Sequence, residues 1–92
     1  MKWTTSDNNN VFSSYHYLLD CQNDGVPVVK NQEVKRIEAL LNRTHKAIES
    51  KFGNISQIRK EMGLEVLKGY PPLKNYAKST QADYQNYLVV VA

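Results

Sequence analysis

The feature that most constrains the fold of this chain is a run of apolar residues at helical spacing between Thr44 and Gly63. The run advances in steps of four, three, three and four residues and comprises Ile48, Phe52, Ile55, Ile58 and Met62. Such spacing predicts an amphipathic helix with one buried stripe, and Thr44 can cap its first turn. We expect one continuous helix despite Gly53. A glycine inside a helix costs about 1 kcal/mol relative to alanine, and burial of five apolar side chains outweighs this.

Two segments before this helix show the same periodicity. Residues 6–20 can be capped by Ser6 or Asp7, and their apolar positions are Val11, Phe12, Tyr15, Leu18 and Leu19. The next segment can be capped by Asn31 and ends near Asn42, and its apolar stripe comprises Val34, Ile37, Leu40 and Leu41. Each segment is expected to form a helix that buries this stripe.

After Gly63 the sequence predicts a loop and then one more helix. Gly69, Pro71 and Pro72 prevent a helix through the middle of residues 64–78, and apolar or aromatic residues are expected to pin this loop to the body: Leu67, Tyr70, Leu73 and Tyr76. Thr80-Gln81-Ala82-Asp83 has the form of a capping box that opens the last helix. The buried face of that helix would comprise Tyr84, Tyr87, Leu88 and Val91.

These elements predict an all-α domain that spans residues 1–92, a small bundle of about four helices with a Gly/Pro-containing loop before the last one. Fraying is expected within residues 1–10, where three asparagines follow one another. The sequence contains no stretch of about 18 apolar residues and no signal-peptide layout, so we expect a cytoplasmic chain without a membrane span.

The sequence contains little that indicates a catalytic site, a metal site or a cofactor site. The single cysteine, Cys21, has no partner for an internal disulfide, and no group of cysteines and histidines has the spacing of zinc ligands. Cys21 also lacks a neighbouring base that would activate it, so we interpret it as a core residue, and His16 as an ordinary exposed histidine. We therefore predict no metal, no cofactor and no catalytic site.

The basic residues are unevenly distributed along the chain. Residues 43–78 hold eight lysines and arginines against three glutamates, a net charge of +5, whereas the remainder has a net charge of −2. Such asymmetry is typical of a surface that faces a polyanion, although solvated basic faces are also common.

A helical wheel of the central segment places a polar set opposite its apolar stripe: Arg43, Lys46, Ser50, Asn54, Gln57, Lys60 and Glu61. Lysine and arginine neutralise phosphates, and the amides of Asn54 and Gln57 can engage adenine. The alternative interpretation is an ordinary solvated helix face. Lys51 and Arg59 fall at the edge of or within the apolar arc, where we expect their charged ends to extend outward to solvent or to pair with acids such as Asp20 or Glu38.

A longer pattern in this region comprises Arg43, Ala47, Ile48, Glu49, Lys51, Asn54, Ile55 and Ser56, then Met62, Gly63, Gly69, Tyr70, Pro72, Leu73, Asn75 and Tyr76. It resembles a module that precedes the nuclease domain in many bacterial HNH-type restriction endonucleases. Those modules read as an arginine, a small residue and I-E-x-K-x-x-N-I-S, followed by L-G, G-Y-x-P-L and N-Y. The resemblance extends from about Phe12 to Tyr76.

The resemblance implies a helical DNA-binding or target-recognition module, one that could sense modified bases, with Arg43, Lys51, Asn54 and Ser56 as candidate contacts. No nuclease domain follows in this sequence, and His16 and His45 are not part of an asparagine-histidine metal motif. A freestanding adaptor and a piece of a longer enzyme are both compatible with this departure from the family.

We therefore expect a DNA-binding module in which the helix over residues 44–62 and the basic loop over residues 68–78 contact duplex DNA. The candidate contact residues are Arg43, Thr44, His45, Lys46, Ser50, Lys51, Asn54, Gln57, Lys60, Lys68, Tyr70 and Lys74. The alternative is a small phage- or plasmid-type protein-interaction module that modulates a host protein. An exposed apolar patch over residues 89–91 would favour this alternative.

Overall fold

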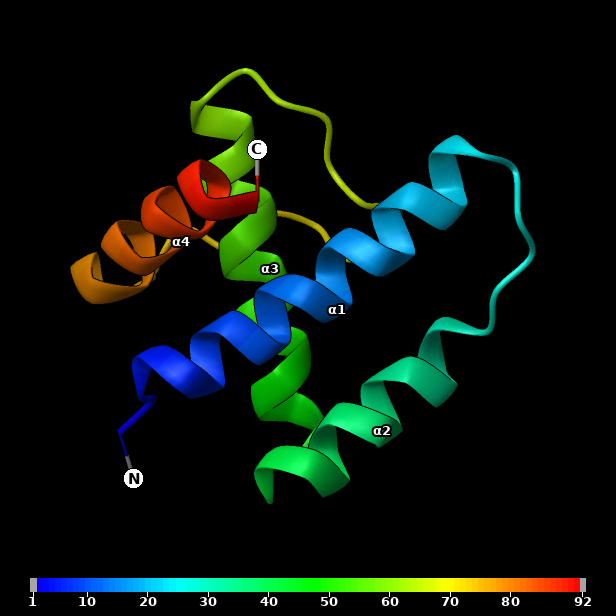
Figure 1. The fold of residues 1–92 in the computed structure, drawn as a ribbon, viewed down its shortest axis with the longest axis horizontal. Coiled ribbons are helices and arrows are strands. Elements are labelled where there is room, and N and C mark those ends of the chain that lie inside the picture. Colours follow the sequence, from blue (N-terminus) through cyan, green and yellow to red (C-terminus); the bar gives the residue numbers. More distant parts are fainter. Residues whose placement is uncertain (1, 92) are drawn as a thin grey trace.

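The computed structural model of this chain describes residues 2–91 (Figure 1). Within that range it contains four helices and no strand: α1 (Thr5–Asn23), α2 (Lys30–Leu41), α3 (His45–Glu61) and α4 (Lys78–Val91). Helix α1 packs against each of the other three, and α2 also packs against α3. The all-α prediction is confirmed. None of these helices is long and apolar enough to cross a membrane.

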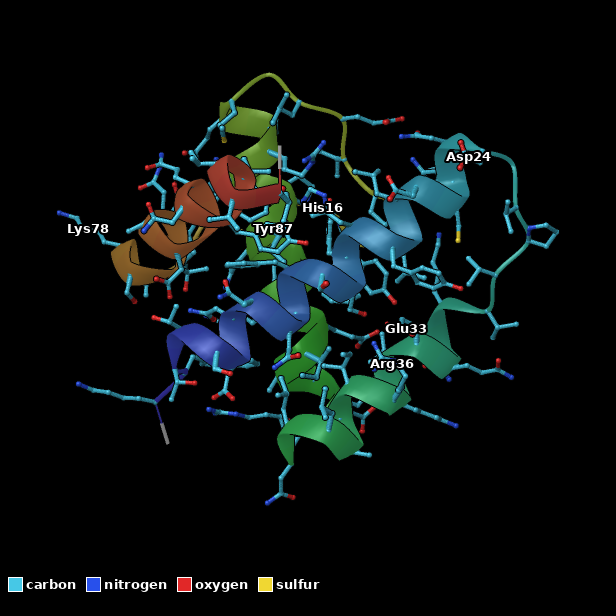
Figure 2. All side chains as sticks on the ribbon, in the orientation of Figure 1. His16, Asp24, Glu33, Arg36, Lys78 and Tyr87 are labelled. Atoms are coloured by element: carbon cyan, nitrogen blue, oxygen red, sulfur yellow. The ribbon has the colours of Figure 1, made fainter. Side chains whose placement is uncertain are left out.

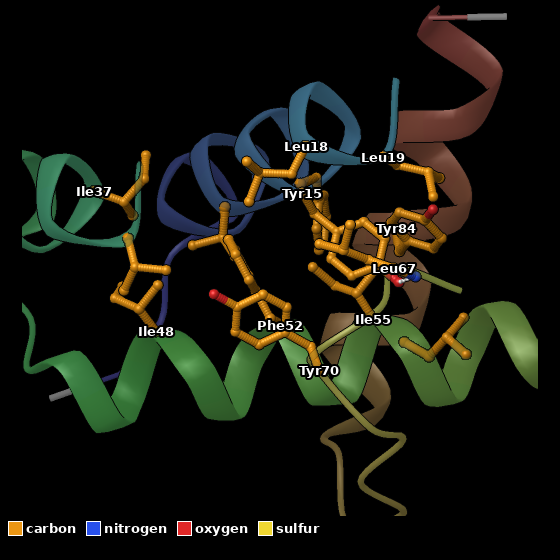
Figure 3. Close-up of a cluster of buried hydrophobic side chains, with 14 residues drawn as sticks. Tyr15, Leu18, Leu19, Ile37, Ile48, Phe52, Ile55, Leu67, Tyr70 and Tyr84 are labelled. Atoms are coloured by element: carbon orange, nitrogen blue, oxygen red, sulfur yellow. Dashed lines mark hydrogen bonds between the residues drawn. The ribbon is translucent and has the colours of Figure 1, made fainter. Parts of the chain in front are cut away.

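The core lies where α1 crosses α3 (Figure 3). Phe52 of α3 stands edge-on to Tyr15 of α1, with ring centroids 5.7 Å apart, and to Tyr70 of the loop, at 4.9 Å. The aliphatic residues that fill the same cluster are Val11, Leu18, Leu19, Val34, Ile37, Ile48, Ile55, Ile58 and Leu67. Most apolar positions predicted for the first three helices therefore line one continuous core. The exposed residues Leu40 and Met62 are exceptions to that prediction.

A capping box with both of its reciprocal hydrogen bonds stabilises the first turn of α1. The Thr4 hydroxyl accepts a hydrogen bond from the Asp7 amide at 3.0 Å, and the Asp7 carboxylate accepts one from the Thr4 amide at 3.2 Å. The cap is thus Thr4, not Ser6 or Asp7. Asn8, expected in a frayed segment, is buried and donates a 2.9 Å hydrogen bond to Asp83 of α4. This contact ties the first turns of α1 to the bundle.

The predicted caps of α2 and α4 are also corrected. Val29 precedes α2 and makes no side-chain capping bond, whereas Asn31 lies inside the helix. The end of α2 is as predicted, because Asn42 adopts the left-handed conformation that often terminates helices. Helix α4 begins at Lys78, so Thr80 lies within it. The Thr80 and Asp83 side chains do not form the predicted capping box because they bond to α3 and α1 respectively.

Helix α3 runs unbroken through Gly53, as predicted. The loop between α3 and α4 lies directly on this glycine. The Leu73 amide donates a 3.0 Å hydrogen bond to the Gly53 carbonyl, and a Cβ atom at position 53 would lie 2.7 Å from Leu73 Cγ. Gly53 therefore permits a close approach of the loop, which a larger residue would block.

Candidate functional site

The twelve predicted DNA-contact residues fall into three groups in the structure. Five are exposed: Thr44, Lys46, Lys60, Lys68 and Lys74. Four are partly buried: Arg43, His45, Ser50 and Asn54. Three are buried: Lys51, Gln57 and Tyr70. The structure thus leaves only part of the predicted surface open to a partner.

Lys51 is an internal cation, with 6% of its surface exposed. Its ammonium group donates a 2.7 Å hydrogen bond to the Thr80 hydroxyl of α4 and lies 4.8 Å from the centroid of the Trp3 ring. Burial, and then the nearby positive charge of Arg43, lower the pKa of Lys51, whereas the charge of Asp83 opposes them. The expected pairing with Asp20 or Glu38 is wrong, and Lys51 instead joins α3 to α4 and the N-terminal segment.

Arg59 is also internal and likewise bonds to neither acid. Its guanidinium donates a 2.8 Å hydrogen bond to the Tyr84 hydroxyl and another bond to the backbone carbonyl of Glu65. The Tyr84 hydroxyl lies 2.7 Å from His16 Nε2. Arg59 and His16 thus both hydrogen-bond to the Tyr84 hydroxyl, which can donate as well as accept, so this hydroxyl links α1, α3 and α4.

His16 was expected to be exposed, but it lies in an aromatic cluster between α1 and α4. Its ring is 5.3 Å from the ring of Tyr87 and 5.7 Å from that of Tyr84, as Figure 2 shows for the labelled His16 and Tyr87. Burial, and then the charge of Arg59, lower its pKa. His16 is therefore a structural residue that favours the neutral form.

Arg43 holds the N-terminal segment. Its guanidinium forms an ion pair with Asp7 at 3.1 Å, donates a 2.7 Å hydrogen bond to the Lys2 carbonyl and lies 4.3 Å from the centroid of Trp3. Its side chain retains only 10% exposure. The Trp3 ring therefore has the cations of both Arg43 and Lys51 against it, an arrangement that sequence spacing did not reveal.

His45, a predicted phosphate contact, lies between two carboxylates. Its Nδ1 is 2.7 Å from Glu38 and its Nε2 is 3.2 Å from Glu49. The hydrogen bond to Glu38, and then the charges of both glutamates, raise the pKa of His45. Glu49 therefore pairs with a residue of its own helix, four positions before it.

The predicted base-reading amides lie in the middle of α3, beside the loop. Gln57 donates a 2.6 Å hydrogen bond to Glu61, which also accepts a 2.7 Å bond from the Tyr76 hydroxyl. The side-chain oxygens of Asn54 and Gln57 are buried and have no hydrogen-bond partner among the described residues. These two amide oxygens are consequently withdrawn from solvent.

The exposed lysines that remain lie on α3 and on the segment after it. Lys46, Ser50, Tyr70 and Leu73 line one hollow of about 240 Å³ between them. Of the eight basic groups in residues 43–78, the five exposed ones are Lys46, Lys60, Lys68, Lys74 and Lys78. Three exposed glutamates lie in the same range, so the exposed groups have a net charge of +2, not +5.

A second surface lies between α1 and α4. It is a groove of about 700 Å³ lined by Thr5, Asn9, Ser13, Asn86, Tyr87 and Val90, among others. Beside it, Val89 is 78% and Val90 82% exposed, and Val91, predicted to be buried, is exposed too. We call this groove and the three valines the α1–α4 surface. Three consecutive valines in a helix are the sequence signal for it, because they cannot all face one core stripe.

Among residues 2–91, no three histidine, cysteine, aspartate or glutamate side chains group closely enough to hold a metal ion. Cys21 is buried, in agreement with its assignment to the core.

Comparison with protein-family models, with curated proteins and with solved structures found no match to this chain. The resemblance to restriction-endonuclease modules therefore stays a prediction.

Proposed function

We propose that this chain is a protein-interaction module that binds its partner through the α1–α4 surface. The observation that carries the proposal is the exposure of adjacent valines, Val89 and Val90, beside a groove that α4 forms with α1. Apolar side chains gathered at the rim of a groove gain free energy when a partner removes them from water.

These valines contribute little to the fold of the chain. Helix α4 is held to the bundle by the buried Tyr84, by the partly buried Tyr87 and Leu88, and by the Thr80 and Asp83 hydrogen bonds. Burial of an exposed valine side chain is worth roughly 1.5 kcal/mol or more. The valine cluster is therefore available to stabilise an interface without loss of intramolecular packing.

Site-specific photo-cross-linking tests this proposal. A benzophenone amino acid at position 90 should yield covalent adducts with protein in living cells, and these adducts should survive nuclease treatment. The same group at Lys35, an exposed position on α2, serves as the matched control and should yield no comparable adduct. Equal labelling at both positions, or none at position 90, would contradict the proposal. The experiment assumes the cytoplasmic location expected from the sequence.

A second candidate function is binding of duplex DNA, and the exposed lysines of α3 and the loop favour it. Lys46 borders the same hollow as the loop residue Tyr70, and Glu49 lines it too. The loop residues Lys68 and Lys74 are also exposed. Because the amide oxygens of Asn54 and Gln57 are buried, this candidate uses lysine contacts to phosphates without base readout. It requires no catalytic step in this chain and is compatible with an adaptor of a restriction system.

Fluorescence anisotropy with duplex DNA at low salt tests this second candidate. Replacement of Lys46 and Lys74 by alanine should weaken binding and reduce the slope of log affinity against log salt by about two, one for each lost phosphate contact. Lys51→Met is the matched control, because this cation is buried and cannot reach phosphate. Absence of binding at micromolar protein would rule this candidate out.

A further inference from the structure

We infer that the partner at the α1–α4 surface is a second copy of this chain, arranged about a two-fold axis. This inference rests on the proposed function and names the occupant of that surface. In a two-fold interface, one patch of the first copy packs against the identical patch of the second. Each group near the axis therefore faces the same group of the other copy. Three properties of the surface suit such self-association.

The first property is the absence of cations and the low charge of the patch that an identical copy would face. The groove-lining residues include one charged side chain, Asp83, and none of the chain's twelve lysines and arginines. The Asp83 carboxylate already accepts a 2.9 Å hydrogen bond from Asn8 and a 3.4 Å bond from Thr5. An identical copy can therefore approach without cation facing cation, which the lysine-bearing surface of α3 and the loop does not allow.

The second property is the chemistry of the polar lining. Asn9, Ser13 and Asn86 carry amide and hydroxyl groups that both donate and accept hydrogen bonds. Such side chains can hydrogen-bond to the same kinds of polar group at the rim of a second copy. A strongly acidic partner would find no complementary charge here, and a strongly basic one would find only Asp83.

The third property is that apolar projections adjoin a concave surface. Val90 is the most exposed of the valines and also lines the groove, whereas Val89 projects beside it. In a two-fold arrangement the valines of one copy enter the groove of the other, and every contact occurs twice. The groove volume of about 700 Å³ leaves room for these side chains.

Sedimentation equilibrium of the purified chain tests the inference. We expect a reversible monomer–dimer equilibrium, and Val90→Asp should raise the dimer dissociation constant by at least about tenfold, because it places an unpaired carboxylate in the interface. Val26→Asp is the matched control, since Val26 is also an exposed valine but lies between α1 and α2. This control should dimerise as the parent chain does, and circular dichroism should show unchanged helicity for both variants.

Two results would overturn the inference: a parent chain that stays monomeric at roughly 0.5 mM, where even a weak dimer is populated, or a Val90→Asp variant that still dimerises fully. The mass of the position-90 photo-adduct separates this inference from the proposed function. An adduct of two copies supports both. Adducts of another mass alone overturn the inference and leave the proposed function standing, and the absence of any adduct overturns both.

Discussion

Gly53 and Leu73 are in direct contact. The Leu73 amide donates a 3.0 Å hydrogen bond to the Gly53 carbonyl, and Leu73 Cγ occupies the space that a side chain at position 53 would need. The Pro71 carbonyl oxygen also lies 3.2 Å from that space. This contact brings the loop onto the polar side of α3. The loop there covers part of the surface that the sequence predicts to face DNA.

The substitution Gly53→Ala tests this contact, and it has two opposing effects on the free energy of unfolding. Alanine favours a helix interior by about 1 kcal/mol, but its methyl group would displace Leu73, and overpacking of this kind costs about 1–3 kcal/mol. We expect the free energy of unfolding to fall by about 1 kcal/mol in urea denaturation. In a Leu73→Ala background the obstructing side chain is gone, so the same Gly53→Ala change should stabilise the chain. The same sign in both backgrounds would contradict this explanation.

Tyr15→Phe is expected to reduce the free energy of unfolding by about 2 kcal/mol. The Tyr15 hydroxyl accepts a 2.9 Å hydrogen bond from the Leu67 amide and bonds to the Ser56 hydroxyl, also at 2.9 Å, both within the core. Removal of the hydroxyl leaves these buried groups without a partner. Tyr17→Phe, at an exposed position of the same helix, provides the control and should change the free energy by less than about 0.5 kcal/mol. Similar losses for the two variants would refute the role of this hydrogen-bonded core.

The two histidines should titrate on opposite sides of the usual value of 6.5. Burial and Arg59 lower the pKa of His16, whereas Glu38 and Glu49 raise that of His45. A titration of both imidazoles by NMR measures each value directly. Observation of His16 as the more basic of the two would overturn the assigned surroundings.

The opposite shifts have opposite consequences for stability. The raised pKa of His45 provides stability that is fully present below pH 6.5 and is lost as the pH rises through the folded-state value. The lowered pKa of His16 has the reverse effect, since stability present above pH 6.5 is lost as the pH falls through the folded-state value. His45→Gln should therefore destabilise the chain most at acidic pH.

Lys51→Met is expected to increase the free energy of unfolding at pH 7 by about 1 kcal/mol, because it replaces a buried cation to which no carboxylate of residues 2–91 is hydrogen-bonded. Burial lowers the pKa of Lys51, so the parent chain gains stability as the pH rises from the folded-state value toward 10.5. The advantage of the variant should shrink over that range. Lys46→Met, at an exposed site, should show neither effect, and a large loss of stability in Lys51→Met would contradict the prediction.

The helix caps show how far local sequence determines local structure in this chain. Thr44 caps α3 as the sequence predicts, and its hydroxyl accepts a hydrogen bond from the Ala47 amide within the same turn. Thr80 and Asp83 have the same local pattern, but their side chains bond to Lys51 and Asn8 from distant helices. A capping pattern is reliable only where no tertiary partner competes for the same side chain.

The sequence by itself determined the four helices and the loop before the last one, because periodic apolar spacing, glycine and proline act over a few residues. Only the tertiary structure decided which polar side chains remain accessible. Lys51 is covered by Trp3 and Thr80, and Gly53 by Leu73, residues that are 20 to 48 positions away in the sequence. Burial depends on what packs against a side chain from such distances, and a helical wheel contains no information about it.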